Sequence, residues 1–144
     1  MSNKPIFTSA AEAEAAFYDA ITKSDLDALM AVWSEDEEVV CVHPDNPRLV
    51  GLAAIRESWR QLFSGNVKIS IRTSHRVVTA NPQLEVHNVV EHIAVEGEKR
   101  LQPPMIATNV YIRGPLGWRL AMHHASAAPD SLHAGRPDAP RIVH

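Results

Sequence analysis

The chain has 144 residues, a formal charge of −3, and 45% hydrophobic and 22% charged residues, which is typical of one globular domain. Its lysines and arginines are scattered, which argues against a nucleic-acid partner. We find no hydrophobic run near the roughly 20 residues of a membrane span, and no export signal. The single cysteine, Cys41, excludes an internal disulfide. We therefore expect a cytoplasmic protein with no membrane partner.

Two helices are expected near the start of the chain. Residues 8–23 carry apolar side chains at helical spacing, and Glu12 follows Ser9 by three residues, as in a capping box. The capping pair at 24–25 then begins a second, shorter helix that continues through residues 26–33.

The next segment predicts one short strand and a third helix. Residues 39–43 are β-prone and end at Pro44, and residues 45–48 read as a loop. A helical pattern then runs from residue 51 to about residue 63, with apolar side chains on one side. This helix would be the last one before the chain changes to strands.

The second half of the chain predicts four consecutive strands. They are expected at residues 67–72, with a continuation to 78, and at 84–95, 105–113 and 118–126. The fold class is therefore α+β, a cone-shaped roll of three N-terminal helices packed on a curved, mostly antiparallel mixed sheet. We expect one domain over residues 1–130 and an extended or loosely ordered tail over 131–144.

Five segments carry a family resemblance in their order and spacing: residues 20–29, 40–44, 51–59, 107–111 and 118–126. Together they resemble the nuclear transport factor 2-like superfamily, and within it the SnoaL-like proteins, over nearly the whole chain. The resemblance implies the cone fold and a small-molecule pocket. It does not specify an activity, because the superfamily includes isomerases, cyclases, dehydratases and oligomerisation domains.

Comparison with ketosteroid isomerase, a member of this superfamily, places His43 at the position of the carboxylate base, just before Pro44. The positions of its two oxyanion donors correspond to Phe17 and Asn109, with Tyr18 as a neighbour. The resemblance therefore implies that the tyrosine donor is lost and that the acid donor has become an amide.

The association domain of calcium/calmodulin-dependent kinase is similar at the end of the last strand. Its acid-binding arginines correspond here to Asn109 and Ala125, so this apparatus is not retained. The same comparison implies that His123 shares the pocket face with Ala125 and that His124 lies on the outer face. A register shift of one residue would exchange the two histidines.

Four residues are candidates for a catalytic role: His43, Asn109, His123 and Glu91. His43 is either a histidine at a strand end, capped by solvent, or a general base in the pocket with a pKa near the working pH. Asn109 either bridges to a neighbouring strand or histidine, or donates to a ligand carbonyl or oxyanion. Glu91 is either exposed or, if it points inward, orients or charges an imidazole. His123 is the histidine that we expect on the pocket face.

Other side chains are expected to contribute to ligand binding. They are Tyr18, Trp33, Cys41, Trp59, His87, Tyr111 and His124. The histidines and Glu91 could supply metal ligands, but they lack the tight spacing of known metal motifs, so we expect no metal site.

These observations favour a pocket protein with acid/base isomerase, lyase or hydratase chemistry on a small apolar substrate with a carbonyl, without a cofactor. His43 would accept the proton, Asn109 would polarise the carbonyl, and His123 or Glu91 would assist. The alternative is a non-catalytic ligand-binding or dimerisation module of unknown function.

A homodimer through the outer sheet face is also expected. The apolar residues assigned to that face are Val110, Ile112, Leu120 and Met122. Together they would leave too much apolar surface exposed on a free monomer.

Overall fold

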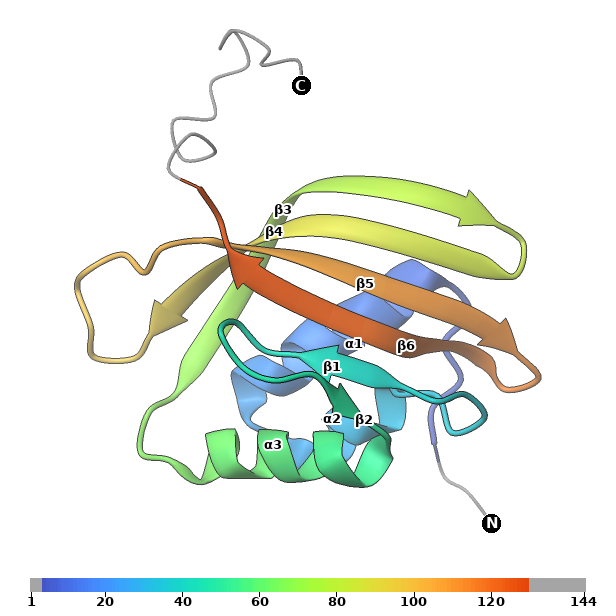
Figure 1. The fold of residues 1–144 in the computed structure, drawn as a ribbon, viewed down its shortest axis with the longest axis horizontal. Coiled ribbons are helices and arrows are strands. Elements are labelled where there is room, and N and C mark those ends of the chain that lie inside the picture. The colour runs from blue at the N-terminus through green and yellow to red at the C-terminus, as the bar shows by residue number, and fades with distance from the viewer. Residues whose placement is uncertain (1–3, 130–144) are drawn as a thin grey trace, which may run out of the picture.

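The computed structural model describes residues 4–129, which form three helices on one side of a curved six-stranded sheet (Figure 1). The helices are α1 Ala10–Lys23, α2 Leu26–Val32 and α3 Leu52–Ser64. The strands are β1 Val40–Val42, β2 Leu49–Val50, β3 Ile69–Asn81, β4 Leu84–Val95, β5 Met105–Gly114 and β6 Gly117–Ala127. This arrangement confirms the predicted α+β class. The expected tail, residues 131–144, lies outside the described residues.

The sheet order is β2-β1-β6-β5-β4-β3, and β1 is parallel to β6 while all other neighbours are antiparallel. The last strand of the chain therefore lies at the centre of the sheet, next to the first. The sequence did not predict β2, a two-residue strand that pairs with β1. Because β1 and β6 run in parallel, the residues that follow β1 lie near the end of β6.

The helix ends follow the local sequence. Ser9 accepts a hydrogen bond from the Glu12 amide, as the predicted capping box requires, while the Glu12 carboxylate accepts one from the amide of Thr8, one residue before the cap. Ser24 ends α1 in the left-handed conformation, and Asp25 then caps α2 by accepting a hydrogen bond from a backbone amide.

A β-bulge in β6 corrects the face predicted for Leu120. Val110 pairs with Met122, but the next residue, Tyr111, pairs with Leu120, so Ala121 is an extra residue in β6. The bulge reverses the alternation, and Leu120 is fully buried in the core rather than on the outer face. Beyond the bulge, His123 lies on the helix-facing side and His124 lies exposed on the outer face.

The core lies between the helices and the concave face of the sheet. Its largest fully buried apolar side chains come from every helix and from the central strands: Phe17, Ile21, Leu29, Trp33, Ile55, Tyr111 and Leu120. Phe17 packs edge-on against Trp33 and Trp59, with ring centroids about 6 Å apart. Within residues 4–129 no helix has both the length and the hydrophobicity needed to cross a membrane.

Candidate active site

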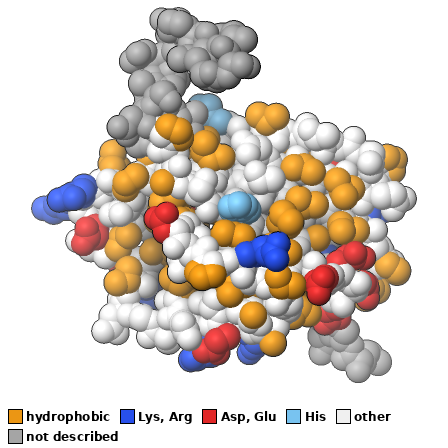
Figure 2. All heavy atoms as spheres, in the orientation of Figure 1, with side chains coloured by type: hydrophobic (Ala, Val, Ile, Leu, Met, Phe, Trp, Pro, Cys, Tyr) orange, Lys and Arg blue, Asp and Glu red, His pale blue; other side chains and the backbone are white. Residues whose placement is uncertain are grey.

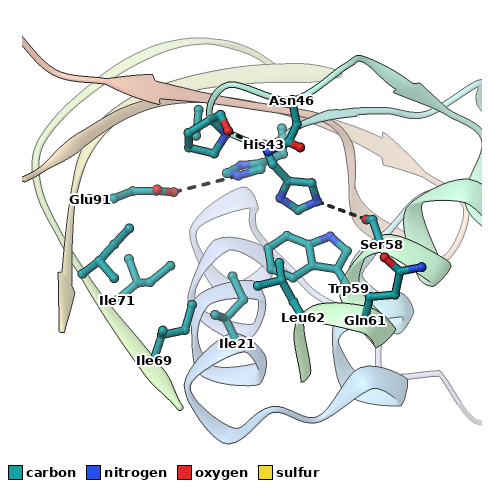
Figure 3. A pocket seen from close by; sticks show the side chains of 14 residues that line it. Ile21, His43, Asn46, Ser58, Trp59, Gln61, Leu62, Ile69, Ile71 and Glu91 are labelled. Atoms are coloured by element: carbon teal, nitrogen blue, oxygen red, sulfur yellow. Dashed lines mark hydrogen bonds and ion pairs between the residues drawn. The ribbon is translucent and has the colours of Figure 1, made fainter. Parts of the chain in front are cut away.

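A cavity of about 550 Å³ opens between α3, the end of β1 and the concave face of the sheet (Figure 3). Its wall is largely apolar: Ile21, Leu62, Ile69, Ile71 and Ile93. Four predicted site residues also line it: His43, Trp59, Glu91 and His123. Among the described residues, the lining includes no lysine or arginine. The site therefore combines an apolar wall with a small set of titratable groups, which is typical of small-molecule pockets.

His43 follows β1 and is held by Ser58 of α3. Its Nε2 lies 3.0 Å from the Ser58 hydroxyl oxygen, and that hydroxyl donates its only proton to the Ile55 carbonyl at 2.8 Å. Ser58 therefore accepts a hydrogen bond from Nε2–H, which leaves Nδ1 of a neutral His43 as a proton acceptor. Burial lowers the pKa of His43, which favours the neutral form at pH 7.

Glu91 projects from β4 into the same cavity and is 3% exposed. Its Oε2 accepts a hydrogen bond of 2.7 Å from the Tyr18 hydroxyl. The pKa of Glu91 is raised to about 7, chiefly by burial; the Tyr18 hydrogen bond opposes this rise, and the nearby Glu14 charge contributes to it. Glu91 can therefore act as an acid or as a base near neutral pH.

His123 lies beside Glu91, with Nε2 at 4.0 Å from Oε2. Burial lowers the pKa of His123 to about 3, and the charges of His43 and His124 act in the same direction. The two side chains are thus a neutral imidazole beside a carboxyl group rather than an ion pair. On the other side of the ring, Nδ1 lies 2.6 Å from Oδ1 of Asn109.

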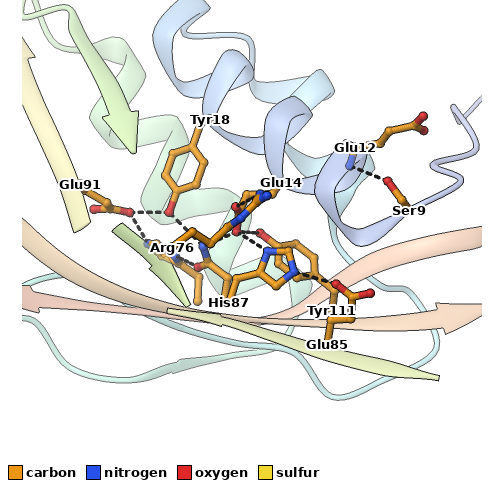
Figure 4. A network of polar contacts seen from close by, with 11 residues as sticks. Ser9, Glu12, Glu14, Tyr18, Arg76, Glu85, His87, Glu91 and Tyr111 are labelled. Carbon is orange, nitrogen blue, oxygen red and sulfur yellow. Dashed lines mark hydrogen bonds and ion pairs between the residues drawn. The ribbon is translucent and has the colours of Figure 1, made fainter. Parts of the chain in front are cut away.

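Glu14, which the sequence pattern did not single out, is the centre of a buried polar network behind the cavity (Figure 4). Its Oε2 accepts hydrogen bonds from the Tyr111 hydroxyl at 2.9 Å and from Nδ2 of Asn109 at 3.3 Å, and lies 3.0 Å from Nδ1 of His87. Arg76 donates to its other oxygen at 3.3 Å. A sequence signal existed, because Glu14 falls on the apolar side of α1.

Asn109 is in a different place from the one its predicted role requires. It is fully buried and does not line the cavity, because its amide is used by Glu14, Tyr18 and His123. It therefore orients other groups and does not polarise a ligand carbonyl. Tyr18, expected to contribute to ligand binding, does not line the cavity, and its hydroxyl donates to Glu91 instead.

The remaining predicted residues lie behind the cavity or away from it. Trp33, Cys41 and Tyr111 are fully buried in the core and do not line the cavity. His87 is held between Glu14 and Glu85 by contacts of 3.0 and 2.8 Å. Burial raises the pKa of the Cys41 thiol to about 12, so the thiol stays protonated and is a poor nucleophile.

The outer-face position of His124 separates this residue from the cavity, where a ligand role was expected. Within residues 4–129 no group of three histidine, cysteine, aspartate or glutamate side chains is arranged to hold a metal ion. What the cavity offers is acid/base chemistry, because it presents a carboxyl group and two imidazoles of different environment.

Solved structures with the same fold include three informative relatives. A protein from Thiobacillus denitrificans, provisionally named a calcium/calmodulin-dependent protein kinase type II association domain, is 35% identical; the match covers 87% of this chain and 99% of that one, with a TM-score of 0.76. A nuclear transport factor 2-like protein from Streptomyces avermitilis, provisionally named a dehydratase, is 28% identical, covering 83% and 93%, with a TM-score of 0.74.

A third structure, a nuclear transport factor 2-like protein of unknown function from Pseudomonas putida KT2440, shares the fold at 16% identity, with coverage of 82% and 83% and a TM-score of 0.74. A comparison with curated proteins found no match. The sequence profile of the SnoaL-like domain matches residues 11–131. The chain therefore belongs to the SnoaL-like domain family, with the nuclear transport factor 2-like fold.

Proposed function

We propose that this protein is an acid/base enzyme acting on a small, largely apolar molecule with a carbonyl group, by isomerisation or by loss or addition of water. The observation that supports this most directly is Glu91, a buried carboxyl group with a pKa of about 7 in the wall of an apolar cavity. Such a group can give a proton to a substrate or take one from it at neutral pH.

His43 supplies the second proton-transfer group, because its Nδ1 is left as an acceptor by the hydrogen bond to Ser58. In the loss of water, His43 takes the proton from the carbon next to the carbonyl. The electron pair of that C–H bond forms the new C=C bond, and the β-hydroxyl leaves as water with the proton of Glu91. Proton exchange with solvent then restores both groups.

One of the similar structures supports the same class of reaction. The Streptomyces avermitilis protein that bears the name dehydratase matches 83% of this chain. Isomerisation needs the same first step, removal of a proton next to a carbonyl, so both reactions are served by one pair of groups.

Deuterium exchange tests this first step without knowledge of the natural substrate. The protein is incubated in D₂O with a panel of small cyclic ketones and β-hydroxy ketones, and deuterium beside the carbonyl is followed by NMR. We expect exchange above the buffer rate for the ketones that bind. His43→Gln should lower this rate by about 10²- to 10⁴-fold, whereas Glu91→Gln should lower the rate of water loss from the β-hydroxy ketones by a similar factor.

Two matched variants serve as controls. His75→Gln and Glu98→Gln change the same residue types at exposed positions away from the cavity and should keep the wild-type rate. The proposal fails if bound ketones exchange only at the buffer rate, if His43→Gln exchanges as fast as the wild type, or if Glu91→Gln loses water from the β-hydroxy ketones as fast as the wild type.

A second candidate function is a non-catalytic association module. It is favoured by the partly exposed apolar outer face of the sheet and by the name of the Thiobacillus denitrificans relative, an association domain. Under this alternative the cavity binds ligands without exchange, and the outer face carries the function.

A further inference from the structure

We propose that the cavity binds a neutral ligand through a hydroxyl group placed between Glu91 and His123, and that Glu14, which does not reach the cavity, fixes the tautomer of His123 that accepts this hydroxyl. The inference rests on the proposed function only in placing the ligand in this cavity. It names the ligand class, a neutral alcohol, and one positioning residue.

The orientation of the Asn109 amide is fixed from two sides. Nδ2 lies 3.3 Å from the Glu14 carboxylate and 2.9 Å from the Tyr18 hydroxyl oxygen. A carboxylate only accepts hydrogen bonds, and Tyr18 uses its single proton at Glu91. Both contacts therefore require the NH₂ group of Asn109, and its carbonyl oxygen must face the other way.

That carbonyl oxygen determines the tautomer of His123. Oδ1 of Asn109 lies 2.6 Å from Nδ1, and a carbonyl can only accept, so Nδ1 carries the proton. Burial keeps the ring neutral, with a pKa lowered to about 3. Nε2 is consequently unprotonated, and its lone pair lies on the side of Glu91.

The gap between the two cavity groups has the size of one oxygen atom. Nε2 of His123 and Oε2 of Glu91 are 4.0 Å apart, too far for a hydrogen bond with each other. A single oxygen about 2.8 Å from each atom fits between them. A hydroxyl matches both groups, since it donates to Nε2 and accepts the proton that Oε2 carries in the neutral carboxyl, while a lone pair of Oε2 still accepts from Tyr18.

Other oxygen groups fit this gap less well. An ether oxygen has no proton for Nε2 and leaves a buried acceptor unsatisfied. A carboxylate brings a charge into a cavity whose described lining contains no lysine or arginine. The geometry therefore selects neutral alcohols over both classes.

The tautomer is measured directly by NMR of protein labelled with ¹⁵N-histidine, because the two ring nitrogens have distinct shifts in each tautomer. We expect the wild type to show His123 only as Nδ1–H. Glu14→Gln should add a detectable Nε2–H population, since an amide side chain no longer forces the Asn109 orientation. Glu12→Gln, an exposed change on the same helix, should match the wild type.

Tyr18→Phe is a second variant that loosens Asn109 from the other side, and it keeps the test decisive if Glu14→Gln does not fold. Nε2–H as the main wild-type tautomer would overturn the inference. So would an unchanged Nδ1–H signal in both folded variants.

Ligand preference is tested with three probes of one shape: 1-indanol, 1-methoxyindane and indane-1-carboxylate. We expect the alcohol to bind at least about tenfold more tightly than the ether, the effect of one lost hydrogen bond, and more tightly than the carboxylate. Glu14→Gln should reduce the preference for alcohol over ether. Equal affinity of alcohol and ether for the wild type would overturn the inference.

The outcomes separate this inference from the proposed function. A fixed Nδ1–H tautomer and a preference for alcohols without deuterium exchange would refute the proposed function and support the inference. Deuterium exchange without any preference for the alcohol would support the proposed function and refute the inference.

Discussion

Glu91 and His123 respond to the same burial in opposite directions. Removal from water disfavours the charged form of each side chain, so the pKa of the carboxyl rises to about 7 and that of the imidazole falls to about 3. Near pH 7 the His123 imidazole is therefore neutral, and the Glu91 carboxyl is partly neutral. This has consequences for stability, because the unfolded chain does not share these shifts.

Glu91 should make the folded state less stable as pH rises from about 4.5 to about 7. In that window the native carboxyl holds a proton that the unfolded chain has released, so deprotonation favours unfolding. Well above pH 7 this deprotonation lowers the free energy of unfolding by on the order of 3 kcal/mol. Glu91→Gln keeps an acceptor for Tyr18 and removes this loss.

Urea denaturation at several pH values measures this effect. The free energy of unfolding of Glu91→Gln minus that of the wild type should grow between pH 5 and pH 7. The same difference for Glu98→Gln, an exposed glutamate, should stay constant. A constant difference for Glu91→Gln as well would show that Glu91 titrates normally.

His123 should destabilise the protein in acid. The unfolded imidazole gains a proton as pH falls below about 6.5, while the buried ring resists protonation until about pH 3. The free energy of unfolding therefore decreases as pH decreases from about 6.5 to about 3. Measured from its own free energy of unfolding at pH 8, His123→Gln should lose less stability in acid than the wild type. The midpoint of its acid unfolding should therefore lie at lower pH. His75→Gln, at an exposed position, should leave the wild-type acid profile unchanged.

At the level of elements, the turn between β5 and β6 is attached to the start of the chain. Phe7 forms a β-bridge with Gly117, and the Phe7 carbonyl accepts a hydrogen bond from the Trp118 amide at 2.9 Å. Gly117 has φ +94°, and a Cβ there would lie 2.6 Å from the Phe7 carbonyl oxygen. A glycine is therefore required for both its conformation and its close backbone contact.

Gly117→Ala should lower the free energy of unfolding by roughly 2 to 4 kcal/mol, because strain at positive φ adds to the displacement of the Phe7 segment. Gly97→Ala is the matched control, with φ +87° and no atom within 4 Å of its added Cβ. Gly97→Ala should lower the free energy of unfolding by only about 1 kcal/mol, which is the cost of placing an alanine at positive φ. Equal losses in urea denaturation would mean that the Phe7 contact contributes nothing.

Local patterns predicted the elements of this protein better than the register between them. The capping box at Ser9 and the boundaries of the long strands follow from sequence, because they depend on neighbouring residues. The bulge at Ala121 depends on how β5 and β6 pair, so the predicted outer face of Leu120 was wrong. β2 was missed because two residues carry too little pattern.

At the scale of the whole molecule, the outer sheet face is an apolar surface that the cavity does not explain. Hydrophobic side chains gather on the face seen in Figure 2, over the strands β5 and β6 in the matching view of Figure 1. Met122 is 36% exposed there, and Val110 is half-buried. We propose that this face forms a homodimer, as the sequence also predicts.

Light scattering after gel filtration tests the dimer. We expect twice the chain mass for the wild type, and Val110→Glu or Met122→Glu should yield the monomer mass, because a charge would be buried at the contact. Leu101→Glu places the same charge at a 91% exposed position in the β4–β5 connection and should remain dimeric. A monomeric wild type would contradict the proposal.

The sequence by itself determined the α+β class, the order of helices and long strands, and the identity of His43, Glu91 and His123 as candidates. The class and the order of elements depend on periodicity and capping, which are local properties, whereas the family resemblance implied the places of His43 and His123. Only the tertiary structure decided that Asn109 orients other groups, that Glu14 is the centre of a buried network, and that Tyr18 reaches Glu91. The physical reason is that these contacts join α1 to strands about 70 to 100 residues later, where distance and burial depend on packing between elements.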